Sequence, residues 1–486
     1  MKNRLKYIIA GAFFAFVLQA YSQNTEIVYL SGTDAARTVD WEFFCTEGRK
    51  SGQWTTIPVP SNWEMQGFGS YSYGLEWYGE REKLGKEKGL YRYQFVVPRD
   101  WKDRVVKLVF DGSMIDTRVW INGKSAGPVH QGGFYRFKYD TGRLLKYGRQ
   151  NLLEVEVAKV SANESVNRAE KCGDYWSFGG IYRPVFLEIL PAIHMERVAL
   201  DPRADGSFRA HVEFSEKLSG CSIEIDLKDM NGNRIGEPGV FECVNGMDVL
   251  EVSGRYESIT AWSHEHPVLY DMSFRLVSEN KVLHELKQRI GFRTIELRKH
   301  DGFYLNGEKV IFKGVDRHSF WPETGRCLSE ENLRTDIRLI REMNMNAVRC
   351  SHYPPDKRFL ELCDSLGLLV LDEVAGWQDG YDTIVGPGLI RETVLRDENH
   401  PSVVIWDHGN EGGWNFASEV VFHELDIQDR PVIYPWLLRN GLDTHHYPVF
   451  DHAVGRSVNG NDPFMATELL HGLYAVSYTH LRAHET

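Results

Sequence analysis

Two glutamates near the C-terminal end of the chain are the residues with the clearest chemical potential. Glu411 ends the run Gly409-Asn410-Glu411, and Glu468 lies within the apolar run 464–470. Two carboxylates can cleave a glycosidic bond by double displacement: one attacks the anomeric carbon, while the other protonates the leaving oxygen and later activates water. The retaining route requires a separation of about 5–5.5 Å. Local structure cannot bring residues so distant in sequence together, but two strand ends on one barrel rim can.

Each glutamate also has an ordinary interpretation. Glu411 could be a surface acid at the start of a helix, where negative charge is favoured. Glu468 is harder to explain in this way, because a carboxylate within an apolar run must be buried with partners or lie at the mouth of a strand. Asn410, beside Glu411, is suited to donate a hydrogen bond to the 2-hydroxyl of a sugar.

The elements that must position these residues follow residue 300. Leu333, Ile337 and Ile340 have helical spacing behind Ser329, which is a typical N-cap residue. A second helical stripe of Phe359, Leu362, Cys363 and Leu366 ends at Gly367. Short apolar runs alternate with these helices, at 310–315, 347–348, 368–371, 403–406, 432–434 and 464–465. Strand and helix in repetition predict a parallel sheet, and so many units predict a (β/α)8 barrel.

Chemically capable side chains occur where these strands are expected to end. They are Asp316-Arg317-His318, Arg349 with Ser351-His352, Asp372-Glu373, Asn410-Glu411, His445-His446-Tyr447 and Thr467-Glu468. Any one of these groups could consist of polar loop residues without a functional role. A barrel gathers the carboxyl ends of its strands on one rim, so we expect these groups to converge there.

Before residue 300 the pattern is that of β-structure. Leu153, Val155 and Val157 alternate with acidic residues, as expected for half-buried strands. Asn122-Gly123 is typical of a hairpin turn. This part is too long for one small sandwich, so we divide it into two β-sandwiches near Pro191.

Composition excludes several classes of protein. The 486 residues are 42% hydrophobic and 26% charged, which excludes a disordered chain or a coiled coil. A net charge of −12 argues against nucleic-acid binding. Residues 1–22 have a basic start, a short apolar run and the small-x-small site Ala20-Tyr21-Ser22, so we predict a cleaved signal peptide and a secreted or periplasmic protein with no membrane span after cleavage. The seven cysteines show no C-x-x-C pair and are expected to be buried free thiols.

The motifs from residue 40 to 474 resemble glycoside hydrolase family 2, the β-galactosidase and β-glucuronidase family. Those that carry the resemblance in the C-terminal part are Asn306-Gly307, the run 312–318, the run 322–326, Asn346-Ala347-Val348-Arg349, Ser351-His352-Tyr353-Pro354, Asp372-Glu373, Arg396-Asp397, Asn399-His400-Pro401-Ser402 and Gly409-Asn410-Glu411. Those in the N-terminal part are Val59-Pro60-Ser61-Asn62-Trp63, Asp174-Tyr175-Trp176, Gly180-Ile181-Tyr182-Arg183 and Gly291-Phe292-Arg293.

The resemblance implies a multidomain β plus α/β fold. Its expected parts are a jelly-roll sugar-binding domain at 23–190, an immunoglobulin-like sandwich at 191–297 and a TIM-barrel catalytic domain at 298–486. Glu411 matches the acid/base of the family and Glu468 its nucleophile. The implied substrate-binding residues are Asn410 at the 2-hydroxyl, His318, His352, Asp174 from the jelly roll and Tyr447. We add Trp377 as a wall of the sugar pocket, although it could equally be a core residue.

The sequence departs from the family pattern in two places. Magnesium-dependent β-galactosidases have Glu and His after the third barrel strand, whereas the stretch 374–380 here has neither, so we predict no essential magnesium and no other cofactor. After His471-Gly472-Leu473-Tyr474 the run 475–486 does not resemble the family. We count seven barrel strands without an eighth and expect a truncated or misread reading frame.

The sequence therefore predicts a retaining exo-β-glycosidase, with β-galactosides as the favoured substrate and an oligosaccharide or glycoside as the partner. β-Glucuronidase activity is the alternative within the enzyme class. A non-catalytic carbohydrate-binding remnant is the alternative outside it, because an incomplete barrel leaves unpaired strand edges. The sequence is compatible with a homo-oligomer and does not determine the oligomeric state.

Overall fold

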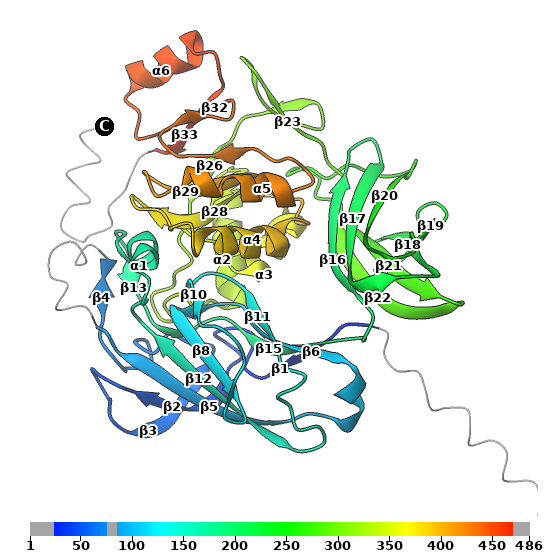
Figure 1. Ribbon diagram of the computed structural model, residues 1–486. Helices are drawn as coiled ribbons and strands as arrows, with labels where there is room; N and C mark the ends of the chain where they lie inside the picture. Colours follow the sequence, from blue (N-terminus) through cyan, green and yellow to red (C-terminus); the bar gives the residue numbers. More distant parts are fainter. Residues whose placement is uncertain (1–23, 75–84, 470–486) are drawn as a thin grey trace, which may run out of the picture.

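The computed structural model describes residues 24–74 and 85–469 (Figure 1). The expected signal peptide and the run 475–486 lie outside this range. Among the described residues, no helix is long and apolar enough to cross a membrane. All seven cysteines are within the described residues, and each is free and buried, as predicted.

The N-terminal part is a β-sandwich. One sheet has the order β1 (Glu26–Tyr29), β15 (Val185–Leu190), β6 (Val105–Phe110) and β11 (Phe137–Asp140). The other has the order β10 (His130–Gln131), β8 (Asp116–Ile121), β12 (Gln150–Ala158), β5 (Lys88–Val96), β2 (Val39–Cys45) and β3 (Trp54–Val59), with β9 (Lys124–Ser125) beside β8. Alternating apolar residues of both sheets form its core, in which Trp41, Phe43 and Trp63 are almost fully buried.

Short elements extend this sandwich toward the barrel. They are β4 (Ser72–Tyr73) paired with β13 (Trp176–Ser177), β7 (Ser113–Met114) paired with β14 (Gly180–Ile181), the 3₁₀ turn η3 (Arg99–Asp103) and the helix α1 (Glu164–Lys171). Asn163 caps α1 by accepting a hydrogen bond from the backbone N–H of Ser165. The helix packs against the third barrel strand, so the jelly roll reaches the barrel rim.

The middle part is a second antiparallel sandwich. A three-stranded sheet has the order β16 (Met195–Pro202), β17 (Ser207–Leu218) and β20 (Met247–Arg255). It faces a four-stranded sheet with the order β19 (Gly239–Glu242), β18 (Cys221–Asp229), β21 (Tyr270–Ser278) and β22 (Lys281–Ile290). Ile223, Ile225 and Leu227 point into the core, as their alternation with polar residues predicts.

The C-terminal part contains the parallel strands. After the antiparallel β23 (Ile295–Arg298), β24 (Gly302–Leu305) and β25 (Glu308–Val310), a parallel sheet has the order β26 (Gly314–Asp316), β27 (Ala347–Arg349), β28 (Leu369–Trp377), β29 (Val403–Asn410) and β30 (Val432–Ile433). A further sheet contains β31 (Leu438–Arg439), β32 (Leu442–His446) and β33 (Phe464–Glu468), of which β32 and β33 are parallel. The helical elements are α2 (Glu330–Glu342), α3 (Lys357–Leu366), α4 (Gly386–Asp397), η4 (Phe416–Ser418), α5 (Val420–Leu425) and α6 (Phe450–Asn459).

The predicted fold class is therefore confirmed: two β-sandwiches precede a barrel of alternating strands and helices (Figure 1). The barrel is not closed by hydrogen bonds along its whole course, because β30 and β32 belong to different sheets among the described residues. Several strands differ in length from the apolar runs that predicted them. In particular, β28 continues past the apolar run through the buried acids Asp372 and Glu373 to Trp377.

The two predicted helices form as expected. Ser329 caps α2, and its side chain and that of Asn332 make a reciprocal capping box. Leu333, Ile337 and Ile340 are the buried residues of this helix. Gly367 ends α3 with a left-handed φ of 77°, a conformation that costs glycine little.

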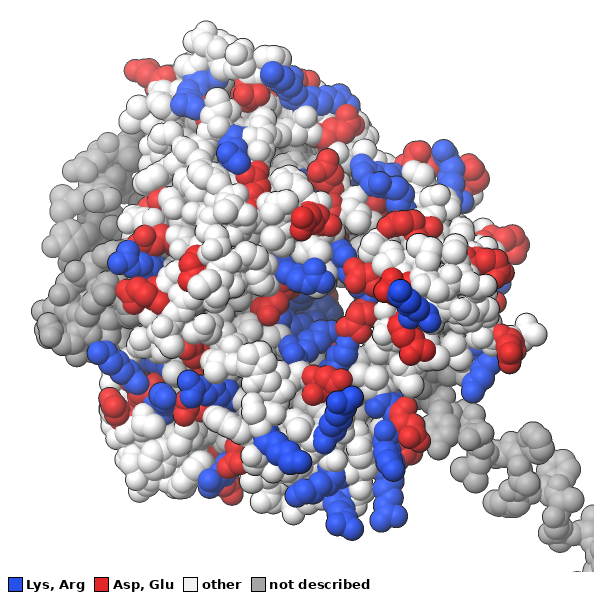
Figure 2. Space-filling view, in the orientation of Figure 1, with Lys and Arg blue, Asp and Glu red and all other residues white. Residues whose placement is uncertain are grey.

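The middle domain is attached to the barrel by charged side chains. Lys/Arg and Asp/Glu residues are interspersed over the face shown in Figure 2. Arg197 of β16 forms an ion pair of 2.7 Å with Glu398, just after α4. Arg293 donates hydrogen bonds to the carbonyl oxygens of Pro401 and Val403 at 2.5 and 2.7 Å. These contacts connect the middle domain to the beginning of β29, which leads to Glu411.

A buried polar network joins the jelly roll to the barrel. Tyr381 follows β28, and its hydroxyl donates to Glu170 Oε1 on α1 at 2.6 Å. The hydroxyls of Tyr381 and Tyr135 are 2.9 Å apart, and the N–H of Gly133 donates to Glu170 Oε2 at 2.9 Å. Burial raises the pKa of Glu170 from 4.5 to about 7, although these hydrogen bonds oppose the rise.

This shift predicts a pH-dependent stability. Between pH 4.5 and 7 the folded protein retains a proton on Glu170 that the unfolded chain has lost, so stability falls as pH rises through this interval. Glu170→Gln removes this dependence. At pH 8 the free energy of unfolding of this variant, measured in urea, should exceed that of the unmodified protein by roughly 1–3 kcal/mol. The control is Glu164→Gln, an exposed acid on the same helix. Equal pH dependence of all three proteins would contradict the prediction.

Candidate active site

Glu411 and Glu468 lie at the carboxyl ends of two strands that belong to different sheets of the barrel. Glu468 is the last residue of β33, and Glu411 directly follows β29. Glu411 has a left-handed φ of 47°. Gly409 has a φ of 77°, and a Cβ there would lie 2.0 Å from the carbonyl oxygen of Gly413. A glycine is therefore required at the turn that places Glu411 on the rim.

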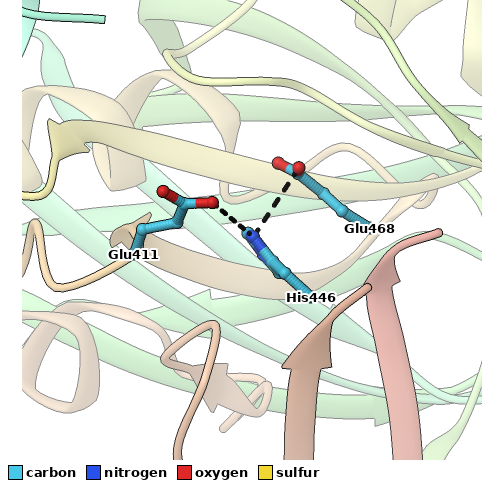
Figure 3. Close-up of side chains that lie close together, drawn as sticks. All are labelled: Glu411, His446 and Glu468. Atoms are coloured by element: carbon cyan, nitrogen blue, oxygen red, sulfur yellow. Dashed lines mark hydrogen bonds and ion pairs between the residues drawn. The ribbon is translucent and has the colours of Figure 1, made fainter. Parts of the chain in front are cut away.

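The two carboxylates face each other across His446, the last residue of β32 (Figure 3). One oxygen of each carboxylate and one imidazole nitrogen all lie within 4.8 Å of one another. His446 Nδ1 is 3.2 Å from Glu411 Oε1 and 3.6 Å from Glu468 Oε2. The limit of 4.8 Å between one oxygen of each carboxylate is compatible with the spacing of about 5–5.5 Å in retaining glycosidases and shorter than the wider spacing in inverting ones.

Glu468 has the environment of an ionised carboxylate. Burial favours its neutral form, but Arg349, His352, His446 and a hydrogen bond donated by the Tyr447 hydroxyl hold the pKa of Glu468 below its ordinary value. Arg349 Nη1 is 2.9 Å from Glu468 Oε1. An ionised carboxylate is the form that can act as a nucleophile.

Glu411 is also held in its ionised form. Burial opposes this, but hydrogen bonds from His446 and Gln378 lower the pKa of Glu411. Gln378 Nε2 donates to Glu411 Oε2 at 3.1 Å. The side chain of Glu411 is 12% exposed, so water and a leaving group can reach it.

Arg349, the last residue of β27, is the centre of a buried charge cluster. Its guanidinium is 2.6 Å from Asp407, 2.7 Å from Glu373, 2.9 Å from Glu468 and 3.4 Å from Asp316. It also donates to Asn410 Oδ1 at 3.1 Å. Burial raises the pKa of Glu373 to about 8 and that of Asp316 to about 6, so part of this acidic cluster is protonated near neutral pH.

Removal of the Arg349 charge should destabilise the protein. Arg349→Met leaves the surrounding carboxylates buried without their cation, at a cost of about 3–5 kcal/mol of unfolding free energy measured in urea. Arg338→Met is the control, because Arg338 lies on the exposed face of α2 with 58% of its side chain accessible. It should change stability by less than about 0.5 kcal/mol. An equal loss in both variants would show that the charge cluster is not the cause.

Of the two predicted subsite histidines, His352 lies beside Glu468 and His318 packs against His352. His352 is buried, and its Nε2 is 3.7 Å from Glu468 Oε1. The ring of His318 packs edge-to-face against that of His352 at 5.2 Å, and its Nδ1 is 3.2 Å from the Tyr353 hydroxyl. Burial lowers the pKa of His352 to about 3 and also lowers that of His318. Both rings are therefore neutral and can donate and accept hydrogen bonds to sugar hydroxyls.

Of the other predicted residues, Tyr447 contacts a carboxylate, whereas Trp377 and Asp174 lie further out. Tyr447 contacts Glu468 directly. Trp377, the last residue of β28, pairs with Asn410 and packs against Cys172 of the jelly roll while remaining partly exposed. Asp174 is half-buried on the jelly-roll loop, and the ring of its neighbour Tyr175 lies 5.7 Å from that of His318. The structure thus brings Asn410, Tyr447 and His352 to the carboxylates, places His318 behind His352, and places Trp377 at the same rim.

Two residues of the site have no assigned role in the sequence analysis. His446 appears there only as part of a polar group after a strand, and Gln378 only in the stretch that departs from the family. The signal for His446 is its place before Tyr447 at a strand end. Gln378 has a left-handed φ of 61° that directs the chain toward Glu411, a local feature with no sequence signal.

Glu411, His446 and Glu468 have polar atoms that are mutually close. We assign no metal to them, because Arg349 and Tyr447 already contact the Glu468 carboxylate and Gln378 already contacts that of Glu411. The stretch 374–380, which begins within β28, does not fit the magnesium site of the magnesium-dependent family members, since it has neither Glu nor His. A metal between the two glutamates would also occupy the carboxylates that the chemistry requires.

Family models of glycoside hydrolase family 2 match most of the chain. The "sugar binding domain" model matches residues 33–191, the model named "Glycosyl hydrolases family 2" matches 193–293, and the "TIM barrel domain" model matches 295–435. The chain is 30% identical over 404 residues to a beta-galactosidase of Lactobacillus delbrueckii subsp. bulgaricus, which covers 76% of this chain and 39% of that protein. It is 32% identical over 330 residues to a beta-galactosidase of Thermoanaerobacter pseudethanolicus, covering 65% and 44%.

Solved structures show the same fold. A beta-glycosidase from Bacteroides vulgatus superposes with a TM-score of 0.74 at 24% identity, over 92% of this chain and 59% of that one. A Bifidobacterium dentium beta-glucuronidase superposes with a TM-score of 0.71 at 21% identity, over 93% and 85%. The chain spans about two fifths of the length of the curated relatives named above. From its three matched domains and the shared architecture, the chain belongs to glycoside hydrolase family 2.

Proposed function

We propose that the protein is a retaining exo-β-glycosidase that hydrolyses terminal β-D-galactosides. The observation that carries the proposal is the pair Glu411 and Glu468, with carboxylate oxygens within 4.8 Å on one rim of the barrel. Both curated relatives named above are beta-galactosidases, which supports the choice of sugar.

In the proposed first step, Glu468 attacks the anomeric carbon and Glu411 protonates the departing glycosidic oxygen. The bond to the leaving group breaks as an ester bond to Glu468 forms. In the second step Glu411, now ionised, takes a proton from water, whose oxygen attacks the anomeric carbon and releases Glu468. The sugar leaves with its original β-configuration after two inversions.

The surrounding residues have proposed binding roles. Arg349 occupies Asn410 Oδ1, so the amide nitrogen of Asn410 is the group that we assign to the sugar 2-hydroxyl. His318 and His352 would bind further hydroxyls. Tyr447 would orient Glu468 and interact with the ring oxygen side of the sugar, while Trp377 and Asp174 would bound the pocket from the rim and from the jelly roll.

β-Glucuronidase activity is the second candidate, because glucuronidases of the same fold superpose over nearly all of this chain. The test compares hydrolysis of 4-nitrophenyl β-galactoside and 4-nitrophenyl β-glucuronide by the full-length protein. A higher kcat/KM for the galactoside, with the β-anomer released first in an NMR time course, supports the proposal. Preference for the glucuronide would overturn the sugar assignment. A folded protein inactive on both would favour the carbohydrate-binding alternative.

We further propose that the protein is exported, since residues 1–22 have the pattern of a signal peptide. Expression of the full chain in a bacterium, followed by cell fractionation and N-terminal sequencing, tests this. Mature protein beginning at about residue 23 in the periplasm or medium is the expected result. Uncleaved protein in the cytoplasm would contradict it.

A further inference from the structure

His446 holds the most informative position that the proposed mechanism leaves unused. Its side chain is fully buried, and its Nδ1 points between the two carboxylates (Figure 3). The backbone fixes this position on both sides: His446 is paired with Glu468 across β32 and β33, and the N–H of Tyr447 donates to the Glu468 carbonyl oxygen at 2.8 Å. Trp436 packs edge-to-face against the imidazole at 5.7 Å.

The hydrogen-bonding pattern selects one tautomer. An ionised carboxylate can only accept, so the contacts at 3.2 and 3.6 Å require a proton on Nδ1. Nε2 is buried and has no hydrogen-bond partner among the described residues. A second proton there would be a buried, unpaired donor on a charged ring. His446 is therefore neutral, with Nδ1–H donated to Glu411, while Glu468 lies just beyond hydrogen-bond distance.

The charged neighbours reinforce this assignment. Burial and the nearby guanidinium of Arg349 both lower the pKa of His446, whereas Glu411 and Glu468 raise it, with a net decrease. Arg349 and His352 also face Glu468. Glu468 thus has several partners besides His446. On Glu411, by contrast, His446 and Gln378 supply the side-chain hydrogen bonds among the described residues.

From this geometry we propose that His446 is a positioning residue that sets the pH range of the enzyme, because its Nδ1–H stabilises the ionised form of Glu411 over the protonated form. The proposal rests on the proposed function. In the first step Glu411 must be protonated. The hydrogen bond from His446 lowers the pH at which Glu411 takes up that proton. In the second step Glu411 acts as a base, and Glu468 is an uncharged ester, so Nδ1–H is free to stabilise Glu411 alone. His446 thus favours deglycosylation and restricts glycosylation to more acidic solution.

The test is the pH profile of kcat/KM for 4-nitrophenyl β-galactoside, whose basic limb reports the protonation of Glu411 in the free enzyme. His446→Leu removes the donor, and the basic limb should move up by about one pH unit. His446→Asn places an amide N–H near the position of Nδ1 and should keep the limb close to that of the unmodified enzyme. His423→Leu is the matched control, because His423 lies on the exposed surface of α5. If His446→Leu does not fold, His446→Ser replaces it.

The outcomes separate this proposal from the proposed function. A basic limb that does not move in a folded, active His446→Leu or His446→Ser enzyme would overturn the role of His446 and leave the glycosidase assignment intact. So would an equal shift in His423→Leu. An unmodified enzyme that is inactive, or whose activity is independent of Glu468, would instead overturn the proposed function.

Discussion

Replacement of Glu468 by glutamine is expected to reduce kcat by about 10⁴-fold or more on every β-glycoside substrate, including those with activated leaving groups. The amide is a poor nucleophile and cannot form the ester intermediate. The shape of the side chain is kept, and Arg349 and Tyr447 remain beside it, so the protein should fold. Turnover of 2,4-dinitrophenyl β-galactoside measures the loss, and circular dichroism and urea unfolding check the fold.

Two further measurements make this prediction specific. Glu424→Gln changes an exposed acid on α5 and should leave kcat within about two-fold of the unmodified enzyme. Incubation with a 2-deoxy-2-fluoro β-galactoside that has a dinitrophenyl leaving group should add one sugar mass to the unmodified protein and none to Glu468→Gln. A peptide map that placed this added mass on any residue other than Glu468 would show that the nucleophile is misassigned.

Replacement of Glu411 by alanine should give a different kinetic pattern. Glycosides with poor leaving groups need the proton that Glu411 supplies, so their hydrolysis should slow by about 10²–10⁴-fold. Dinitrophenolate departs without protonation, so the first step with 2,4-dinitrophenyl β-galactoside should be nearly normal. The glycosyl-enzyme then accumulates because no base activates water, and a burst of dinitrophenolate should precede slow turnover.

Azide provides the decisive measurement for Glu411. This anion needs no general base and should attack the anomeric carbon of the intermediate, which displaces the Glu468 carboxylate and gives the β-galactosyl azide. Azide should therefore restore turnover of the dinitrophenyl substrate in Glu411→Ala but not in Glu468→Gln. An α-configured azide, or rescue of Glu468→Gln instead, would mean that the two roles are reversed.

The elements set by local sequence were predictable. The capping of α2 by Ser329 and the end of α3 at Gly367 depend on residues within one turn of the helix, and both were confirmed. The length of β28 was not predictable in this way. It includes the buried acids Asp372 and Glu373, and the burial of Glu373 is tolerated because Arg349 of β27 supplies an ion pair. Such a pairing joins residues of different strands and leaves no local pattern.

The candidate site shows the same division. Glu411, Asn410 and Glu468 could be singled out because strand order in a barrel places strand ends on one rim. The position of His446 between the carboxylates depends on the register of β32 with β33, which includes an irregularity between His445 and His446. A shift of one residue there would turn the imidazole to the other face. Register of this kind is decided by packing of whole elements.

In the proposed function, the contact between α1 and β28 would link substrate binding to domain association. Tyr175 of the jelly roll and Trp377 of the barrel both lie at the rim, on the two sides of the domain boundary. The hydrogen bond between Tyr381 and Glu170 joins the same two domains. A ligand that contacts residues from both sides binds only when the domains are docked, so it stabilises their association by mass action. A saturating sugar-like inhibitor should therefore raise the temperature at which both domains unfold. Under the proposed function, the affinity for such a ligand would also depend on how firmly the two domains are held together.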